Sequence, residues 1–163
     1  MGVTIHYEGR LRSLDAYDEL TDRLKKEADK HEWLFSVVVA KKVHLARVIQ
    51  GKLEDYVGPI KGIVINLHED CEAVRFLFDG TGFMQGFVKT QFCPTGIHVR
   101  IVELLRSIQD LFTSLRVVDE GAYWETGQKD TLEQKKKFLA NEIEKLTDYL
   151  GGQDRGSREP GST

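Results

Sequence analysis

The stretch from Ile63 to Phe92 decides the fold, and it reads IVINLHEDCEAVRFLFDGTGFMQGFVKTQF. Within it, apolar side chains alternate with other side chains in three runs, which are residues 63–67, 74–78 and 83–92. A period of two is typical of β-strands that bury one face. The two joints between the runs are short enough for hairpins. We therefore predict an antiparallel meander of three strands.

The residues before the meander predict one helix and further strands. Residues 3–11 alternate in part and indicate an opening strand, and residues 13–30 have the apolar spacing of an amphipathic helix. Residues 33–40 form a continuous apolar run, which is typical of a strand covered on both faces. A lysine pair separates this run from another predicted strand at 43–49. The polar residues 51–59 are predicted to form a loop.

The residues after the meander predict two more helices and a short strand. Residues 95–114 carry a wide apolar stripe at helical spacing, so we expect a helix that lies across the sheet as the main element of the core. Residues 116–118 form a short predicted strand. The last helix is predicted over 130–150, where a glycine pair stops it. Residues 151–163 are predicted to be a flexible tail, since no apolar residue anchors them.

These elements make one α+β domain over residues 1–150. The sheet is predicted to be largely antiparallel, in the element order β-α-β-β-β-β-β-α-β-α, with long helices packed mainly on one face. The predicted core consists of Phe35, Val37, Val39, Ile63, Ile65, Val74, Phe76, Phe78, Val88, Ile101, Leu105, Ile108 and Phe112. An open sheet with a long helix laid over it often encloses a cavity, so a pocket is expected.

The composition fits a globular domain and argues against several classes of protein. The chain has 163 residues, of which 40% are hydrophobic and 30% are charged, and its net charge is −3. This balance argues against disorder and against a nucleic-acid-binding protein held by a positive field. The longest nearly apolar run is far too short to span a bilayer, and the first residues have no signal-peptide pattern. We therefore expect no nucleic-acid partner and no membrane partner.

Cysteine usage and missing motifs bear on location and chemistry. Cys71 and Cys93 are the two cysteines of the chain, and one possible disulfide in a domain of this size is a weak sign of export. We therefore expect two reduced thiols and a cytoplasmic location. The chain has no glycine-rich phosphate loop and no HExxH, CxxC or GxSxG motif. The sequence thus predicts no cofactor and no metal site.

The densest cluster of polar and aromatic residues follows the short predicted strand. Asp119, Glu120 and Glu125 could hold a hard cation or share acid and base roles. Tyr123 and Trp124 could stack on a sugar or a base. The alternative is that both aromatic side chains pack the loop onto the core while the acids cap backbone groups and stay in solvent. If a ligand site exists, we expect it at this loop.

Cys93 and His98 form a second candidate site. If the long helix begins at Thr95, the positive helix end would lower the pKa of the Cys93 thiol, and the His98 imidazole could take its proton. That arrangement would activate a cysteine nucleophile. The alternative is that Cys93 fills a small apolar space and His98 caps the helix.

Two further groups carry weaker signals. The turn at residues 68–72 has side chains of metal-ligand types, but consecutive turn positions point in different directions, so we expect a solvated turn. Lys89 is the charged residue on the last strand of the meander. Facing outward it would protect a sheet edge, and facing a cavity it would bind an anion. We favour the outward position.

The last predicted helix has an apolar seam at Leu139, Ile143, Leu146 and Leu150. The seam resembles that of a coiled coil but covers fewer than two heptads, so the helix must pack on something. Its own sheet is the expected surface. A homodimer through residues 130–150 is the alternative.

The strong fold pattern and the missing catalytic signature favour a non-enzymatic binding or interaction domain, with a small molecule or another protein as its partner. The alternative is a small enzyme. It would be either a hydrolase that uses a divalent cation at Asp119, Glu120 and Glu125, or a thiol enzyme that uses Cys93 and His98.

Overall fold

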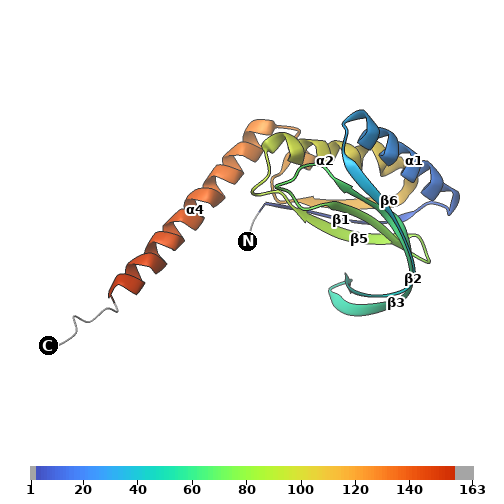
Figure 1. Ribbon diagram of the computed structural model, residues 1–163, viewed down its shortest axis with the longest axis horizontal. Helices are drawn as coiled ribbons and strands as arrows, with labels where there is room; N and C mark the ends of the chain where they lie inside the picture. Colours follow the sequence, from blue (N-terminus) through green and yellow to red (C-terminus); the bar gives the residue numbers. More distant parts are fainter. Residues whose placement is uncertain (1–2, 157–163) are drawn as a thin grey trace.

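The predicted meander is present in the computed structural model, which describes residues 3–156 (Figure 1). Its strands are β3 (Lys52–Asn66), β4 (Val74–Asp79) and β5 (Phe83–Lys89). Three more strands complete one sheet, namely β1 (Thr4–Leu11), β2 (Leu34–Ile49) and β6 (Phe112–Asp119). The order across the sheet is β2-β3-β4-β5-β1-β6, and every neighbouring pair is antiparallel. The predicted α+β class with an antiparallel sheet is therefore confirmed.

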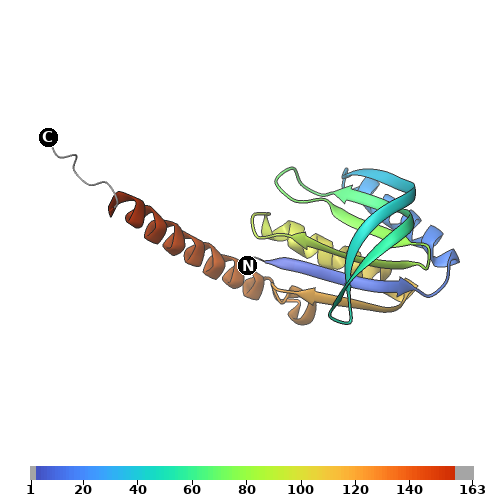
Figure 2. The same cartoon turned by 90° about the horizontal axis from the view of Figure 1, so that it is seen from below.

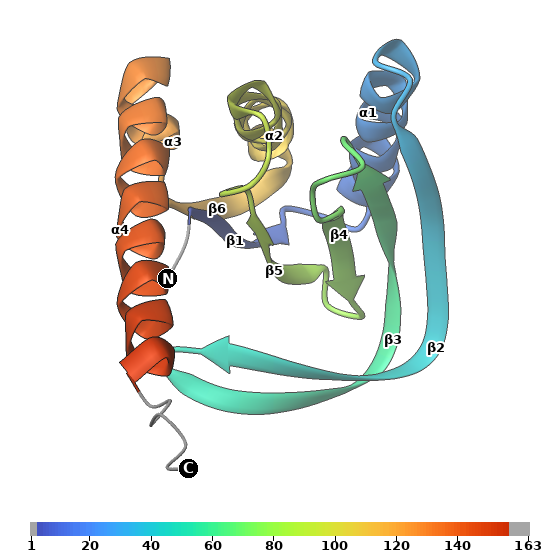
Figure 3. The ribbon, with the colours of Figure 1, turned by 60° about the vertical axis from the view of Figure 1, so that its left-hand side comes forward.

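Two helices cover one face of the sheet and leave the other face open (Figures 1 and 3). They are α1 (Asp15–Lys30) and α2 (Thr95–Ile108). Their buried apolar residues include Leu20 and Leu24 from α1 and Ile101, Leu105 and Ile108 from α2. Full burial of each such side chain stabilises the fold by about 1.5–3 kcal/mol. α2 is shorter than predicted, because the 3-10 turn η1 (Gln109–Leu111) leads directly into β6.

The predicted core is correct for the meander and for α2 but wrong for the start of β2. The correctly predicted residues are Ile63, Ile65, Val74, Phe76, Phe78, Val88, Ile101, Leu105, Ile108 and Phe112. Phe35, Val37 and Val39 are exposed instead, and Val39 exposes 80% of its surface. These residues lie on the same face as buried Ile63 and Ile65, but β2 is at the edge of the sheet, where the helices do not cover this face.

β2 and β3 form one long hairpin, which the sequence analysis does not predict. The predicted strands at 33–40 and 43–49 are a single strand, because the register shift between Ala40 and Val43 disturbs the pairing of β2 without ending the strand. The observed order consequently has four strands between α1 and α2 instead of the predicted five.

The hairpin turns tightly where a loop is predicted. Gln50 and Gly51 have φ angles of 51° and 77°, as a two-residue hairpin turn requires. Most of the predicted loop at 51–59 therefore belongs to β3. The distal half of the hairpin curves across the face of the sheet that the helices leave open (Figures 2 and 3).

The last two helices do not cover the sheet. α3 (Tyr123–Thr126) is a single turn after β6, and α4 (Lys129–Gly156) begins beside it with Leu132 buried. α4 then projects away from the rest of the domain (Figures 1 and 2). The prediction that this helix packs on its own sheet is therefore wrong.

The end of α4 also differs from the prediction. The sequence predicts a stop at Gly151 and Gly152, but the helix continues to Gly156. Part of the predicted tail is thus helical, and residues 157–163 lie outside the described residues. From residue 3 to residue 156, no helix combines the length and the apolar character needed to cross a membrane.

Candidate ligand-binding site

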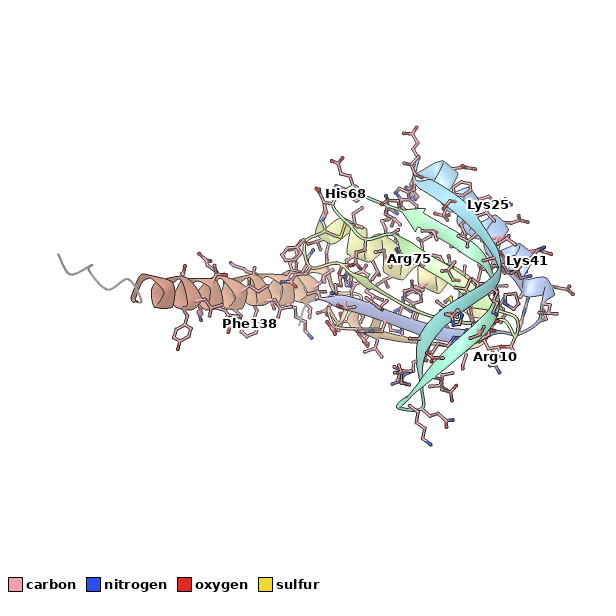
Figure 4. All side chains as sticks on the ribbon, turned by 60° about the horizontal axis from the view of Figure 1, so that its bottom comes forward. Arg10, Lys25, Lys41, His68, Arg75 and Phe138 are labelled. Atoms are coloured by element: carbon pink, nitrogen blue, oxygen red, sulfur yellow. A yellow bond between two sulfur atoms is a disulfide. The ribbon has the colours of Figure 1, made fainter. Side chains whose placement is uncertain are left out.

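The open face of the sheet carries a pocket of about 640 Å³ beneath the distal half of the β2–β3 hairpin. Hairpin residues 45–48 and 50–51 line one side, and β1, β4, β5 and β6 supply the other lining residues. Figure 4 shows the hairpin crossing in front of these strands. A cavity is expected next to the long helix, but this pocket lies on the face opposite α1 and α2.

Arg47 fastens the hairpin to the rest of the domain. Its Nη1 donates a hydrogen bond of 2.6 Å to Asp79 Oδ2 at the end of β4, and both residues are buried. The guanidinium also lies over the rings of Tyr56 and Phe83, at 4.4 Å and 5.2 Å from their centroids. An unpaired buried charge would be strongly unfavourable, so the hairpin is held where Arg47 meets its carboxylate.

The turn after β4 holds the Asp79 carboxylate in position for this contact. Asp79 Oδ1 accepts hydrogen bonds from the backbone N–H groups of Thr81 and Phe83 and from the Thr81 hydroxyl. Burial acts to raise the pKa of Asp79, but the hydrogen bonds from Thr81 and Arg47 outweigh it, and the pKa lies below its ordinary value. The carboxylate is therefore ionised at neutral pH, as the pairing with Arg47 requires.

Gln85 provides a second attachment of the hairpin to the sheet. Its side-chain Oε1 accepts a hydrogen bond of 3.1 Å from the Val48 N–H, and its Nε2 donates one of 2.7 Å to the Val48 carbonyl. Nε2 also donates to Glu8 at 3.0 Å. One side chain of β5 thus joins β1 to the backbone of the hairpin, and it keeps the hairpin close to the sheet.

The lining of the pocket is rich in positive charge. It contains three arginines, Arg47, Arg75 and Arg116, and one carboxylate, Glu8. Arg47 is paired with Asp79, and Arg116 lies 3.4 Å from Glu8. Within residues 3–156, Arg75 is the lining arginine that has no carboxylate at ion-pair distance, whereas the other two have one. Its guanidinium is therefore available to an anion.

Apolar side chains also contribute to the lining. They include Leu45, Val48, Leu77, Phe87 and Val118. Phe87 exposes 54% of its surface, and its ring centroid lies 6.1 Å from that of His6. An exposed aromatic ring in a concave site is a surface on which an apolar ligand group can pack.

The backbone of Arg75 is held by Tyr7 from the core side of the sheet. The Tyr7 hydroxyl donates a hydrogen bond of 2.7 Å to the Arg75 carbonyl and accepts one of 3.3 Å from the Arg75 N–H. Burial raises the pKa of Tyr7 above its ordinary value, so the hydroxyl stays protonated and keeps donating. The tyrosine ring passes Gly86, where an added Cβ would lie 2.8 Å from it. Arg75 therefore projects from a fixed backbone.

Asp119, the first carboxylate of the predicted loop site, is bonded inside the protein. Asp119 is buried, and His98 Nε2 lies 3.1 Å from its Oδ2. The carboxylate also accepts hydrogen bonds from the backbone N–H groups of Gly121 and Trp124. Burial acts to raise the pKa of Asp119, but His98 and these N–H groups outweigh it and lower the pKa. Asp119 is therefore a structural anchor of the loop.

The other two carboxylates of the loop point elsewhere. Glu120 Oε2 accepts a hydrogen bond of 3.0 Å from the backbone N–H of Thr4, and its Oε1 lies 3.5 Å from His6 Nε2. Glu125 is exposed on α3. The structure thus does not bring Asp119, Glu120 and Glu125 together, and the geometry gives no support to a cation-assisted hydrolase at this loop.

The aromatic residues of the loop pack as the alternative interpretation predicts. Tyr123 and Trp124 are partly buried against the core. The Arg106 guanidinium lies 4.2 Å from the centroid of the Trp124 ring and also donates a hydrogen bond to the Trp124 carbonyl. Neither ring lines the pocket on the open face. Both side chains therefore hold α3 against α2.

His98 is engaged with residues other than Cys93. Thr90 Oγ1 lies 2.5 Å from His98 Nδ1, and Asp119 occupies the other ring nitrogen. A Thr-His-Asp row has the residue types of a catalytic triad. However, Thr90 and His98 are completely buried, so no substrate reaches the hydroxyl. The row instead ties the first turn of α2 to the end of β6 and to the segment after β5.

The two cysteines are bonded to each other. Cys71 and Cys93 form a disulfide, with their Cα atoms 5.5 Å apart. The expectation of two reduced thiols is therefore wrong, and Cys93 has no free thiol that could act as a nucleophile. The turn at 68–72 is tied to the domain by this bond and by Glu72, whose Oε2 accepts a hydrogen bond of 3.1 Å from the Lys89 N–H.

Lys89 takes the outward position that we favour, but it has neither of the two roles considered for it. It is exposed on the open face of the sheet, on the same side of β5 as Phe87. β5 lies between β4 and β1, so Lys89 cannot protect a sheet edge. It does not line the pocket either.

Neither a metal-ligand cluster among the described residues nor a similar known protein points to a function. In the part of the chain that the structure describes, no group of three or more His, Cys, Asp or Glu side chains is placed to hold a metal ion. Comparison with known proteins found no matching family model, no similar curated protein and no similar solved structure. The function is therefore inferred from the geometry of the site.

The sequence analysis names none of the pocket residues as site residues. A signal for some of them is present in the meander, where Arg75 and Phe87 alternate with buried residues. Such positions point away from the helices, so an arginine and a phenylalanine there mark the open face. The hairpin side of the pocket has no comparable signal, because Arg47 reaches Asp79 across 32 residues of chain.

Proposed function

We propose that this domain is a non-enzymatic binding protein that takes up a small organic anion with an apolar body in the pocket beneath the β2–β3 hairpin. The observation that carries the proposal is the Arg75 guanidinium, which lines a pocket that also has several apolar side chains, and which has no carboxylate at ion-pair distance among the described residues. A guanidinium binds an anionic group such as a carboxylate through two parallel hydrogen bonds.

The size and the lining of the pocket support a ligand of this class. Its volume of about 640 Å³ lies within the range of small-molecule sites, which is about 300–1,000 Å³. Phe87 and Leu77 from the sheet and Leu45 from the hairpin offer apolar contacts to the ligand body. A ligand between these residues would contact both the hairpin and the sheet.

We propose that the domain binds its ligand and does not convert it chemically. The triad-like row at His98 is buried, Cys93 is bonded to Cys71, and the carboxylates of the 119–125 loop are separate. A cytoplasmic location stays a prediction. The disulfide weighs against it, because such bonds persist mainly in oxidising compartments.

The test uses 2-naphthoate as the probe and neutral 2-naphthamide as its isostere. In titrations followed by NMR chemical shifts and by calorimetry, naphthoate should bind about tenfold or more tightly than naphthamide, because a hydrogen bond to a charged group contributes about 1.5–3 kcal/mol. Arg75→Gln should reduce the affinity for naphthoate to that for naphthamide. Phe87→Ala should weaken the binding of both probes.

Two control variants match these substitutions. Arg10 lies on the same face of the sheet outside the pocket, and Phe138 is exposed on α4, so Arg10→Gln and Phe138→Ala should leave both affinities unchanged (Figure 4). The proposal fails if naphthoate and naphthamide bind equally. It also fails if Arg75→Gln has no larger effect than Arg10→Gln.

A further inference from the structure

The projecting part of α4 carries a row of exposed apolar side chains. Ile143, Leu146 and Leu150 expose 40%, 59% and 54% of their surfaces, and Leu139 is half-buried. Their spacing of four, three and four residues places them on one side of the helix. No other element among residues 3–156 covers this row, which we call the α4 seam.

An isolated helix of this kind gains little stability from its own hydrogen bonds. Most helices in proteins are stabilised mainly by the packing of an apolar face and not by their own backbone hydrogen bonds. In α4 the first turns are held by the domain, through buried Leu132 and through Lys136, whose Nζ donates a hydrogen bond to the Cys93 carbonyl. From Leu139 onward the helix needs another partner.

The α4 seam is complementary to itself. Its spacings read the same from either end, so two antiparallel copies can place Leu139 against Leu150 and Ile143 against Leu146. This register gives four layers, each with an apolar residue from both helices, about a two-fold axis between residues 144 and 145. Alternating layers of this kind are the packing of a short coiled coil.

Other registers fit less well. A shift of one heptad towards the domain would place the partner's Leu150 at Leu132, which is already buried by its own chain. A shift of one heptad in the other direction leaves two apolar layers instead of four. In a parallel pair both domains would lie at the same end of the helix pair. Each would then occupy the side of the helix where Leu132 and Lys136 already contact their own domain.

We propose that α4 is a dimerisation helix that binds α4 of a second copy of this chain in antiparallel orientation, with Leu139 facing Leu150 and Ile143 facing Leu146. The pairing covers the α4 seam of both chains and places the two domains at opposite ends of the helix pair. It is independent of the ligand proposed for the pocket, which lies on the open face of the sheet.

The first test is the mass of the full chain in solution, measured by light scattering during gel filtration over a range of concentrations. The chain should be a dimer, and Ile143→Glu and Leu146→Glu should each raise the dissociation constant at least a hundredfold. Asn141→Glu adds the same charge on the opposite side of the helix and should leave the dimer intact. Tryptophan fluorescence should show that the domain remains folded in all three variants.

The second test measures orientation with spin labels at Lys137→Cys and Glu144→Cys, which are exposed positions one heptad apart. In the antiparallel register, residue 137 lies about 22 Å along the axis from its mate and residue 144 lies about 1.5 Å from its mate. With helix axes about 10 Å apart, the corresponding points on the two axes are about 24 Å and about 10 Å apart. A parallel pair would give equal distances and overturn the proposal. A chain that stays monomeric at every concentration, or an Asn141→Glu variant that dissociates as Ile143→Glu does, would overturn it as well.

Discussion

Replacement of Asp79 by asparagine tests what holds the hairpin over the pocket. Asparagine keeps an oxygen that accepts the N–H groups of Thr81 and Phe83, so the turn after β4 should survive. It removes the negative charge that meets the Arg47 guanidinium at 2.6 Å. The complementary change, Arg47→Met, keeps an apolar stem of similar length and removes the positive charge.

The magnitudes follow from the contacts of Arg47. A hydrogen bond to a charged group contributes about 1.5–3 kcal/mol, so Asp79→Asn should lower the free energy of unfolding by about 2 kcal/mol. Arg47→Met also loses the two contacts with aromatic rings, each worth about 0.5–1 kcal/mol, and should lower it by about 3.5 kcal/mol. Once Arg47 is absent, Asp79→Asn removes no further contact with the guanidinium. The loss in the double variant should therefore equal that in Arg47→Met, which gives a coupling energy of about 2 kcal/mol.

The assay is urea denaturation of the four proteins of the cycle, followed by tryptophan fluorescence. Arg116 and Glu8 supply the control cycle, because their side chains are 74% and 30% exposed and such pairs contribute about 0–1 kcal/mol. Amide hydrogen exchange of residues 45–51 should accelerate in Asp79→Asn. A coupling energy for Arg47 and Asp79 no larger than that of the control pair, with unchanged exchange in the hairpin, would refute the fastening role.

Three further predictions concern the core and the ends of the sheet. Stability should fall as the pH drops below about 4, because the pKa of Asp119 lies below its ordinary value. Burial acts to raise this pKa, but the contact with His98 outweighs burial. The stabilisation is complete above the unfolded-state pKa and is lost as the pH falls through the folded-state pKa, so urea midpoints should show a weaker acid dependence for Asp119→Asn. Gly62→Ala should lower the free energy of unfolding by about 3 kcal/mol or more, since its Cβ would lie 2.0 Å from the Phe76 carbonyl oxygen, and thermal melting measures this. Iodoacetamide should label Cys93 only after a reductant is added, as mass spectrometry can show; rapid labelling without reductant would contradict the disulfide.

The elements that the sequence predicts well are those in which burial imposes a period. In β4, Val74, Phe76 and Phe78 are buried beneath the helices while Arg75 is exposed, so the sequence alternates with the strand. In α2, Ile101 and the residues at helical spacing from it are buried for the same reason. Burial of one face of a strand or a helix is enough to place its apolar residues at the period of that element.

The distal hairpin lacks this constraint. Its strands extend beyond the helices, and residues on both faces are largely exposed, so burial imposes no alternation there. The apolar run at 33–40 misleads for the same reason, since an edge strand need not be covered. The remaining signal is Gln50-Gly51, a pair that suits a two-residue turn between strands. Because the hairpin forms one side of the pocket, the sequence does not indicate the site either.

The hairpin links binding to local stability, and this link distinguishes a pocket from a flat sheet surface. Apart from Arg47, Gln85, the Tyr56 hydroxyl that accepts a hydrogen bond from the Gly80 N–H, and the pairing of β3 with β4 at its base, few contacts hold the distal strands, so they should open more readily than the sheet. A ligand that contacts both Arg75 and Leu45 binds only the closed form. At a hundredfold excess over its dissociation constant it should stabilise that form by about 2.7 kcal/mol and slow the local exchange of residues 45–51 about a hundredfold. A ligand held by the sheet alone would leave the local exchange of these amides unchanged while it raised the global stability. Amide hydrogen exchange in the hairpin, compared with that in α2, therefore shows whether the ligand contacts both sides of the pocket.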